Sequence, residues 1–275
     1  MARYEHLHKK AGSAEEGLVR LIEILKLLRS PGGCDWDRVQ THKSIRNCLI
    51  EEAYETVEAI DNEDFENLCE ELGDVLLQVV FHGNMAEEEG KFSILDIENG
   101  VCDKMIRRHP HVFFDQYIES IEQSIDKLAE KWENIKREEH KGETLTENIR
   151  KVPNALPALI KSYKVQKKAA RVGFDWDSVS GALDKLAEEE RELMGAMYDG
   201  NKEHMKEELG DLLFTVVNIA RFLDLDPEEA LNGATEKFIK RLEYIEKYGT
   251  MEGKTFEEMS PEQMDRLWKR AKDEL

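Results

Sequence analysis

The chain has 275 residues, of which 59 are acidic and 39 basic, and its formal net charge is −20. This charge argues against a sequence-independent grip on nucleic acid and against docking on anionic lipid, because both need a cationic surface. No apolar run approaches the roughly 20 residues of a membrane span, and residues 1–10 lack the apolar core of a signal peptide. We therefore expect a cytoplasmic protein that binds neither nucleic acid nor membrane.

The first half of the chain has the pattern of consecutive amphipathic helices. Apolar residues recur at helical spacing over residues 45–60, 65–82, 94–107 and 120–139. Asp64, just before the second stretch, is the predicted N-cap, and Pro110 is expected to stop the third helix. β-Branched segments with alternating polarity and turn signals are missing, so the pattern predicts an all-α fold.

The helical unit occurs twice in the chain. The sequence EELGDVLL at residues 70–77 recurs as EELGDLLF at 207–214, an offset of 137 residues, and the pattern Glu-Glu-x-x-Glu at 51–55 recurs at 188–192 with the same offset. DWD recurs at 35–37 and 175–177, and Lys-x-x-x-Arg at 104–108 and 237–241. Four signals in the same order indicate a tandem duplication of a domain-sized unit. We predict a first domain over 1–140, a linker over 141–152 and a second domain over 153–275.

Four carboxylates of the first copy lie beside the apolar arcs of two consecutive helices: Glu52, Glu55, Glu71 and Asp74. The loop between these helices is short, so they should pack antiparallel and bring the carboxylates together. Crowded carboxylates repel one another, and protonation or a divalent cation relieves that repulsion. Oxygen-only ligands suit Mg²⁺ or Mn²⁺. The alternative is a set of salt bridges to neighbouring Lys and Arg side chains.

A basic pair follows the carboxylates in each copy. Lys104 and Arg108 are four residues apart and therefore share one helix face, as do Lys237 and Arg241 in the second copy. Two cations beside a metal–carboxylate cluster suit a phosphate chain, although a basic pair on a solvated surface is the alternative.

One tryptophan of each copy is a candidate for stacking on a nucleobase. Trp36 and Trp176 occupy the same place in the repeated DWD motif. The alternative for both is a structural role in the core, which is the commoner role of an aromatic side chain.

Several motifs together resemble the MazG family of the all-α nucleoside triphosphate pyrophosphatases. These motifs are GCDWD at 33–37, RRHPHVF at 107–113, PNALP at 153–157 and ARVGFDW at 170–176, and the resemblance extends over residues 18–268. It implies hydrolysis of nucleoside triphosphates to monophosphate and pyrophosphate, Mg²⁺ as cofactor with Mn²⁺ as a substitute, a homodimer, and a house-cleaning role. Phosphoribosyl-ATP or dUTP as a narrower substrate is an alternative, and so is a non-catalytic helical regulatory binder.

The resemblance also implies roles for particular residues. The second-copy metal ligands would be Glu189, Glu192, Glu208 and Asp211, with Glu52, Glu55, Glu71 and Asp74 as the first-copy equivalents. Lys237 and Arg241 would contact the phosphates, with Lys104 and Arg108 in the first copy. Apart from the resemblance, we take Asn218 and Trp176 as further candidate substrate-binding residues. Metal ions held by the carboxylates would activate a water that attacks the α-phosphorus, and the basic pairs would offset the charge on the leaving pyrophosphate. Glu51 and Glu188 would orient the water or hold a ligand in place.

The two copies differ at one position of this set. Asn218 has Phe81 at its matching place, so the copies need not be equivalent. We expect the second copy to carry most of the activity.

Overall fold

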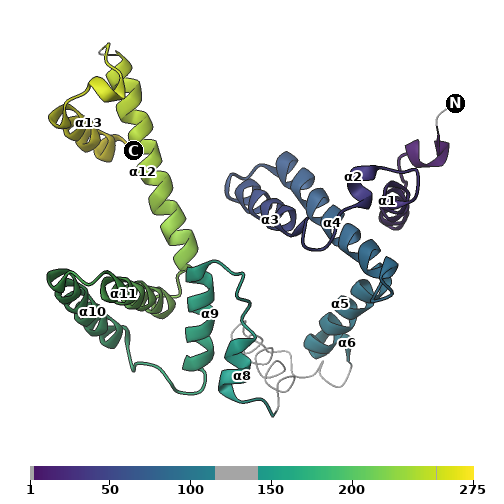
Figure 1. Cartoon of the computed structure of the whole chain (residues 1–275), viewed down its shortest axis with the longest axis horizontal. Helices are drawn as coiled ribbons and strands as arrows, with labels where there is room; N and C mark the ends of the chain where they lie inside the picture. The colour runs from purple at the N-terminus through teal and green to yellow at the C-terminus, as the bar shows by residue number, and fades with distance from the viewer. Residues whose placement is uncertain (1–2, 115–141, 252) are drawn as a thin grey trace. The chain divides into compact units, whose positions relative to one another are not determined.

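The computed structural model describes residues 3–114, 142–251 and 253–275 of the chain. These residues form helices and connecting turns, with no strand among them, which confirms the predicted all-α class (Figure 1). The chain divides into two compact units, Met1–Lys136 and Arg137–Leu275. The first unit contains η1 (Glu5–His8), α1 (Ala14–Arg29), α2 (Asp35–Arg38), α3 (Arg46–Asp61), α4 (Phe65–Glu88), α5 (Ile94–Arg108) and α6 (Pro110–Phe113). The second contains α8 (Leu145–Arg150), α9 (Ala158–Ala170), α10 (Val179–Asp199), α11 (Lys202–Phe222), α12 (Pro227–Met251), η3 (Phe256–Glu258) and α13 (Pro261–Glu274).

The antiparallel hairpin of α3 and α4 is the main element of the first unit. Asp64 caps α4 as predicted, because its Oδ1 accepts a hydrogen bond from the Asn67 backbone nitrogen at 3.1 Å. Helix α4 continues six residues beyond the predicted end, through Gly83 to Glu88, and the chain turns at Gly90, where φ is 64°. The extra turns carry Met85, which is 3% exposed and belongs to the core of this unit.

Helix α5 crosses the end of α4 at a glycine. Ser93 caps α5, and the helix ends at Arg108, in agreement with the expected stop near Pro110. A Cβ atom on Gly83 of α4 would lie 2.3 Å from Ile94 Cδ1, so the two helices approach closely only because this residue is glycine. The fourth predicted helix, over 120–139, lies outside the described residues.

The second unit repeats the hairpin with α10 and α11. Gly200 adopts a left-handed conformation with φ 69° after α10, and Asn201 caps α11 by accepting from the backbone nitrogens of Glu203 and His204. Helix α12 then runs without a break to Met251, and α13 packs against it. Ile245, Met259 and Leu267 form the small core between them.

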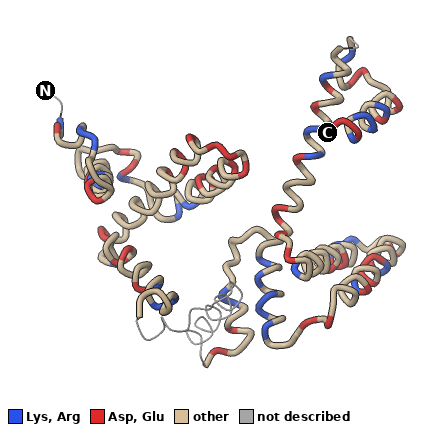
Figure 2. Tube along the Cα trace, turned by 180° about the vertical axis from the view of Figure 1, so that it is seen from behind, with Lys and Arg blue, Asp and Glu red and all other residues tan. Residues whose placement is uncertain are grey.

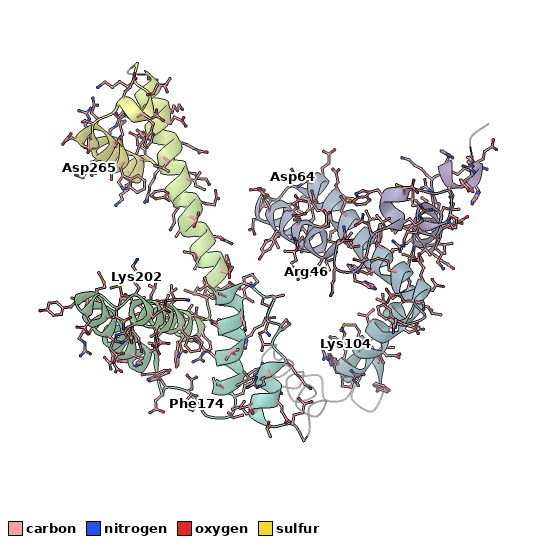
Figure 3. All side chains as sticks on the ribbon, viewed as in Figure 1. Arg46, Asp64, Lys104, Phe174, Lys202 and Asp265 are labelled. Carbon is pink, nitrogen blue, oxygen red and sulfur yellow. The ribbon has the colours of Figure 1, made fainter. Side chains whose placement is uncertain are left out.

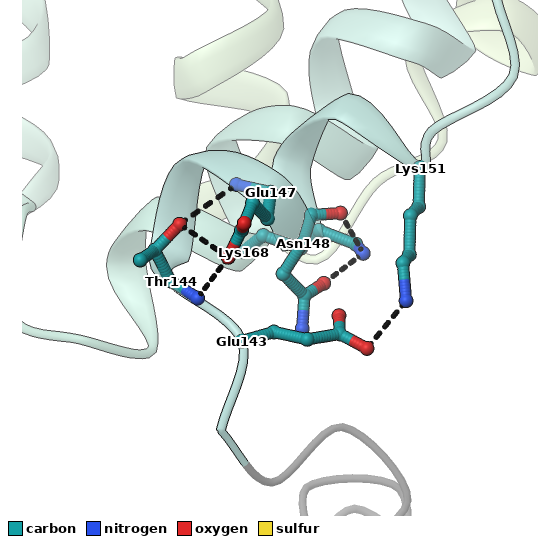
Figure 4. A network of polar contacts seen from close by, with 6 residues as sticks. All are labelled: Glu143, Thr144, Glu147, Asn148, Lys151 and Lys168. Carbon is teal, nitrogen blue, oxygen red and sulfur yellow. Dashed lines mark hydrogen bonds and ion pairs between the residues drawn. The ribbon is translucent and has the colours of Figure 1, made fainter.

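A polar network joins α8 to α9. Thr144 and Glu147 form a capping box at the start of α8, and Lys168 of α9 donates to the backbone oxygen of Asn148 at 2.8 Å (Figure 4). Lys151 pairs with Glu143 at 2.5 Å. The segment predicted as a linker, 141–152, therefore contains a helix of the second unit, α8, which packs against α9, and its role as a linker stays a prediction.

The hairpins leave much of their apolar surface uncovered. Leu49, Val57 and Ile60 of α3 are exposed, as is Leu72 of α4 at 52%. In the second unit Tyr198 is 94% exposed, and other exposed apolar residues are Met194, Met197, Leu209, Leu213 and Phe214. Apolar patches of this extent are typical of surfaces that another protein surface covers.

Charge is distributed unevenly along the helices. Acidic residues gather on the two hairpins, whereas α9 carries a row of lysines (Figure 2). Across the described ranges, none of the helices combines the length and apolarity that crossing a bilayer requires.

Candidate functional site

Three of the four first-copy carboxylates lie together on the α3–α4 hairpin. Oxygen atoms of Glu52, Glu55 and Glu71 lie within 4.8 Å of one another. Burial, and then the charges of Asp74 and Glu55, raises the pKa of Glu52. For Glu71 burial again comes first and the charges of Glu55 and Asp74 follow, so Asp74 acts on both carboxylates. The antiparallel packing predicted from the short loop thus brings the predicted ligands into one cluster.

The second copy builds its cluster on the α10–α11 hairpin. Oxygen atoms of Glu189, Glu208 and Asp211 lie within 4.8 Å of one another, and so do those of Glu188, Glu189 and Glu192. Glu189 is the common member and is 3% exposed. Its Oε2 is buried and has no hydrogen-bond partner among the described residues. Together, these two groups of three carboxylates therefore contain all four predicted ligands and Glu188.

Two basic side chains already contact the second cluster. Lys185 Nζ lies 2.6 Å from a carboxylate oxygen of both Glu188 and Glu189, and His204 Nε2 lies 2.9 Å from Glu208. The bond from Lys185 lowers the pKa of Glu188. Burial raises the pKa of Glu192, and the positive charge of Lys185 opposes that increase. Salt bridges thus compensate part of this cluster, whereas burial and crowding dominate the first.

Both basic pairs lie on the helix that follows the hairpin. Lys104 and Arg108 belong to α5, on which Figure 3 labels Lys104. Lys237 is exposed on α12, and the guanidinium carbon of Arg241 lies 5.4 Å from the centroid of the Trp268 ring. The structure thus brings the carboxylates of each copy together, and the phosphate-binding role of the basic pairs stays a prediction.

A pocket of about 440 Å³ opens between α8, α9, α11 and the segment that follows α9. Trp176 and Asn218, both predicted to bind substrate, line it together. Other lining residues are Gln166, Phe174, Asp175, Phe214 and Arg221, of which Phe174 is labelled in Figure 3. The only charged side chains in the lining, Asp175 and Arg221, pair with each other at 2.5 Å. The pocket is therefore aromatic and close to neutral.

The alternative role of the two repeated tryptophans, as core residues, is wrong. Trp36 is 63% exposed and Trp176 is 43% exposed. The DWD motif lies outside the regular pattern of the long helices, so hydrophobic periodicity could not show whether its tryptophan is covered.

Sequence reasoning missed the residues that surround Asn218. Arg221 follows it by one helical turn, and Gln166 lies on α9. Gln166 is 6% exposed, and its Nε2 donates to the Phe214 backbone oxygen at 2.7 Å. The spacing of Asn218 and Arg221 on α11 was a usable signal, but nothing in the sequence placed α9 against that face.

The first copy has a different arrangement at the matching place. Phe81, at the position of Asn218, is 6% exposed and lies beneath the guanidinium of Arg29, whose central carbon is 5.5 Å from the ring centroid. Arg29 in turn makes a two-bond contact with Glu88, at 2.9 and 2.7 Å. A salt-bridged, aromatic contact therefore stands at the position of Asn218, and Arg29, Asn84 and Glu88 line a pocket of about 420 Å³ beside it.

The family model for the MazG nucleotide pyrophosphohydrolase domain matches the chain twice, over residues 40–113 and 178–245. The chain belongs to the MazG family. Each MazG match contains one complete set of predicted carboxylates and one basic pair, whereas Trp36 and Trp176 fall just before the matched ranges.

Several relatives share most of the chain. The nucleoside triphosphate pyrophosphohydrolase/pyrophosphatase MazG of Thermotoga maritima is 44% identical over 264 residues, which are 96% of this chain and 98% of that protein. The nucleoside triphosphate pyrophosphohydrolase of Escherichia coli K12 is 43% identical over 258 residues, covering 92% of this chain and 96% of that protein. The Bacillus subtilis protein YabN is 47% identical over 251 residues, which are only 50% of its own length.

Proposed function

We propose that this MazG protein hydrolyses nucleoside triphosphates between the α and β phosphates, releasing a nucleoside monophosphate and pyrophosphate with Mg²⁺ as cofactor. Its family and its relatives make it a nucleoside triphosphate pyrophosphohydrolase, a hydrolase acting on acid anhydrides. The observation that carries the finer proposal is the position of a carboxylate cluster and an aromatic, neutral pocket on one helix, α11. House-cleaning of nucleotide pools in the cytoplasm is the role we propose for this activity.

The carboxylates of the second copy fit a hard divalent cation. All the predicted ligands offer oxygen, which suits Mg²⁺ and allows Mn²⁺. The buried, unbonded Oε2 of Glu189 leaves a lone pair that a cation would satisfy. Glu189, Glu192, Glu208 and Asp211 would hold the ion, with Glu52, Glu55, Glu71 and Asp74 as their equivalents. When bound, the ion would supply charge neutralisation of the triphosphate and a more acidic water.

The remaining groups suit the rest of the nucleotide. Asn218 lies seven residues beyond Asp211 on α11, which is close to two helical turns and about 10 Å along the same face. A nucleotide spans a comparable distance from its α-phosphate to the far edge of its base, so we place the nucleoside in the pocket lined by Trp176 and Asn218.

The basic pairs act on the phosphates, and Glu188 acts on the attacking water. Lys237 and Arg241 would bind the β- and γ-phosphates and offset charge as pyrophosphate leaves, as Lys104 and Arg108 would in the first copy. Glu188, whose pKa the bond from Lys185 lowers, stays ionised and accepts hydrogen bonds. It is therefore suited to orient a water, the role we also give to Glu51.

The decisive experiment measures products from ribo- and deoxyribonucleoside triphosphates with and without Mg²⁺. We expect monophosphate and pyrophosphate in equal amounts, and only with metal. The panel includes dUTP and phosphoribosyl-ATP, and turnover of one of these alone would replace the broad specificity by a narrow one. Release of inorganic phosphate in place of pyrophosphate would contradict the proposed cleavage position.

A substitution tests the metal ligands. Glu192→Gln removes the negative charge of one predicted metal ligand and should lower kcat by about 100-fold or more. The pKa of Glu192 is raised, so its ionised form is disfavoured in the metal-free fold, and the variant should melt no lower than the wild type without metal. Glu190→Gln, one residue away on α10 and outside the cluster, is the matched control. Wild-type turnover in Glu192→Gln would remove Glu192 from the ligand set.

A further inference from the structure

Three polar side chains connect α11 to the segment after α9 in the second unit. Arg221 donates from Nε and Nη2 to Asn218 Oδ1, at 3.1 and 2.6 Å, and its Nη2 also donates to Asp175 Oδ1 at 2.5 Å. The side chain of Arg221 is 11% exposed, and Asn218 as a whole residue is 4% exposed. Charge-assisted hydrogen bonds from a planar, partly buried guanidinium hold the side chains of Asn218 and Asp175 in fixed orientations.

These bonds decide which end of the Asn218 amide is available. An asparagine amide has an oxygen that accepts and a nitrogen that donates, and the two ends are nearly equal in size. Both contacts from Arg221 reach Oδ1, and no described bond uses Nδ2. Since Asn218 lines the pocket, its remaining polar group there is a donor.

We propose that Arg221 is a positioning residue, which holds the Asn218 amide with its NH₂ group toward the nucleoside. The pocket then selects a hydrogen-bond acceptor, on the ribose or on the base. This inference rests on the proposed function, because it assumes that the nucleoside occupies this pocket.

The first copy supports a role beyond folding. At the offset of 137 residues, Arg221 corresponds to Asn84 and Asn218 to Phe81. Asp35, the counterpart of Asp175, pairs with Arg38 of its own helix at 2.7 Å. The α3–α4 hairpin therefore folds without a bond between the positions that match Arg221 and Asn218, and its α2 segment is joined to α4 by a different residue, Arg29, which donates to the Asp37 backbone oxygen and to Glu88.

The primary test is Arg221→Met, which keeps the length of the side chain and removes its donors. The amide of Asn218 can then rotate and present its oxygen. We expect KM for a nucleoside triphosphate to rise about tenfold, roughly the effect of one hydrogen bond, while kcat changes far less. Calorimetry with an α,β-methylene nucleoside triphosphate should give the same loss of affinity. Arg221→Lys, which retains a single donor group, should recover part of it.

The matched control is Arg29→Met. Arg29 makes the same kind of charge-assisted contacts in the first unit, to Glu88 and to the Asp37 backbone oxygen at 2.6 Å. Its loss should lower the melting temperature without changing KM. An Arg221→Met variant that also changes only the melting temperature would overturn the inference.

A double-mutant cycle tests whether Arg221 acts through Asn218. If it does, Arg221→Met has no further effect on KM in an Asn218→Leu background. An equal rise in KM in both backgrounds would overturn the inference. Substrate analogues identify the acceptor that Asn218 contacts. The analogues lack the 2′- or the 3′-hydroxyl, or carry different bases. The acceptor is the group whose removal abolishes the tenfold difference in KM between wild type and Arg221→Met. A wild-type protein without pyrophosphate release contradicts the proposed function, whereas an active wild type with normal KM in Arg221→Met contradicts this inference alone.

Discussion

At the scale of single residues, the two carboxylate clusters differ in the charges that surround them. Burial and crowding raise the pKa values of Glu52 and Glu71 in the first cluster. In the second, Lys185 contacts Glu188 and Glu189 directly. A cation that binds the first cluster relieves repulsion, whereas one that binds the second must also displace or tolerate an ammonium group.

The contact between Arg29 and Glu88 predicts a dependence of stability on pH. The hydrogen bond from Arg29 lowers the pKa of Glu88 below its ordinary value. A lowered carboxyl pKa stabilises the fold above the unfolded-state value of about 4.3, and this contribution disappears as the pH falls through the folded-state value. Glu88→Gln should therefore lower the melting temperature at pH 7 and have a smaller effect near pH 3.

Melting curves of Glu88→Gln and wild type from pH 3 to pH 7 test this dependence. Glu89→Gln, the next residue and without a described ion pair, is the control. A constant difference between Glu88→Gln and wild type across the range would contradict the linkage.

At the scale of elements, the crossing of α4 and α5 depends on Gly83. A methyl group there would overlap Ile94, which is 7% exposed and has little room to move. Overpacking costs about 1–3 kcal/mol, more than the gain of up to about 1 kcal/mol from replacing a helical glycine by alanine. Gly83→Ala should lower the free energy of unfolding. Gly100→Ala on α5, where an added Cβ atom would meet nothing within 4 Å beyond its own helix backbone and chain neighbours, should raise it instead, and denaturant titration measures both.

The helices that carry the basic pairs differ in length in a way that favours the second copy. Arg108 is the last residue of α5, where helices fray, whereas α12 continues ten residues beyond Arg241 to Met251. Arg241 also rests on the Trp268 ring. A side chain that is held before substrate arrives loses less entropy when it binds phosphate.

At the scale of the whole molecule, we predict that the second copy carries most of the turnover. Glu55→Ala and Glu192→Ala remove equivalent predicted ligands, one from each copy. We expect Glu192→Ala to abolish nearly all hydrolysis and Glu55→Ala to retain most of it. The reverse result would assign the activity to the first copy.

The uncovered apolar faces of the hairpins predict a homodimer. Leu209, Leu213 and Tyr198 are exposed in the second unit, and a second copy of the chain would remove such faces from water. Light scattering at micromolar concentration should give twice the mass of 31.9 kDa. A monomer at that concentration would contradict the prediction, and Tyr198→Glu should weaken the dimer without affecting the fold.

The all-α class, the duplication, the ends of several helices and most members of each carboxylate cluster followed from the sequence alone. These features depend on short-range rules, because helical periodicity and a short loop suffice to place Glu52, Glu55 and Glu71 together. Only the tertiary structure showed that α9 packs beside α11, and so that Asn218, Arg221 and Asp175 meet at one pocket. Contacts between elements far apart in the chain depend on how side chains fill space, and hydrophobic periodicity within one helix does not contain that information.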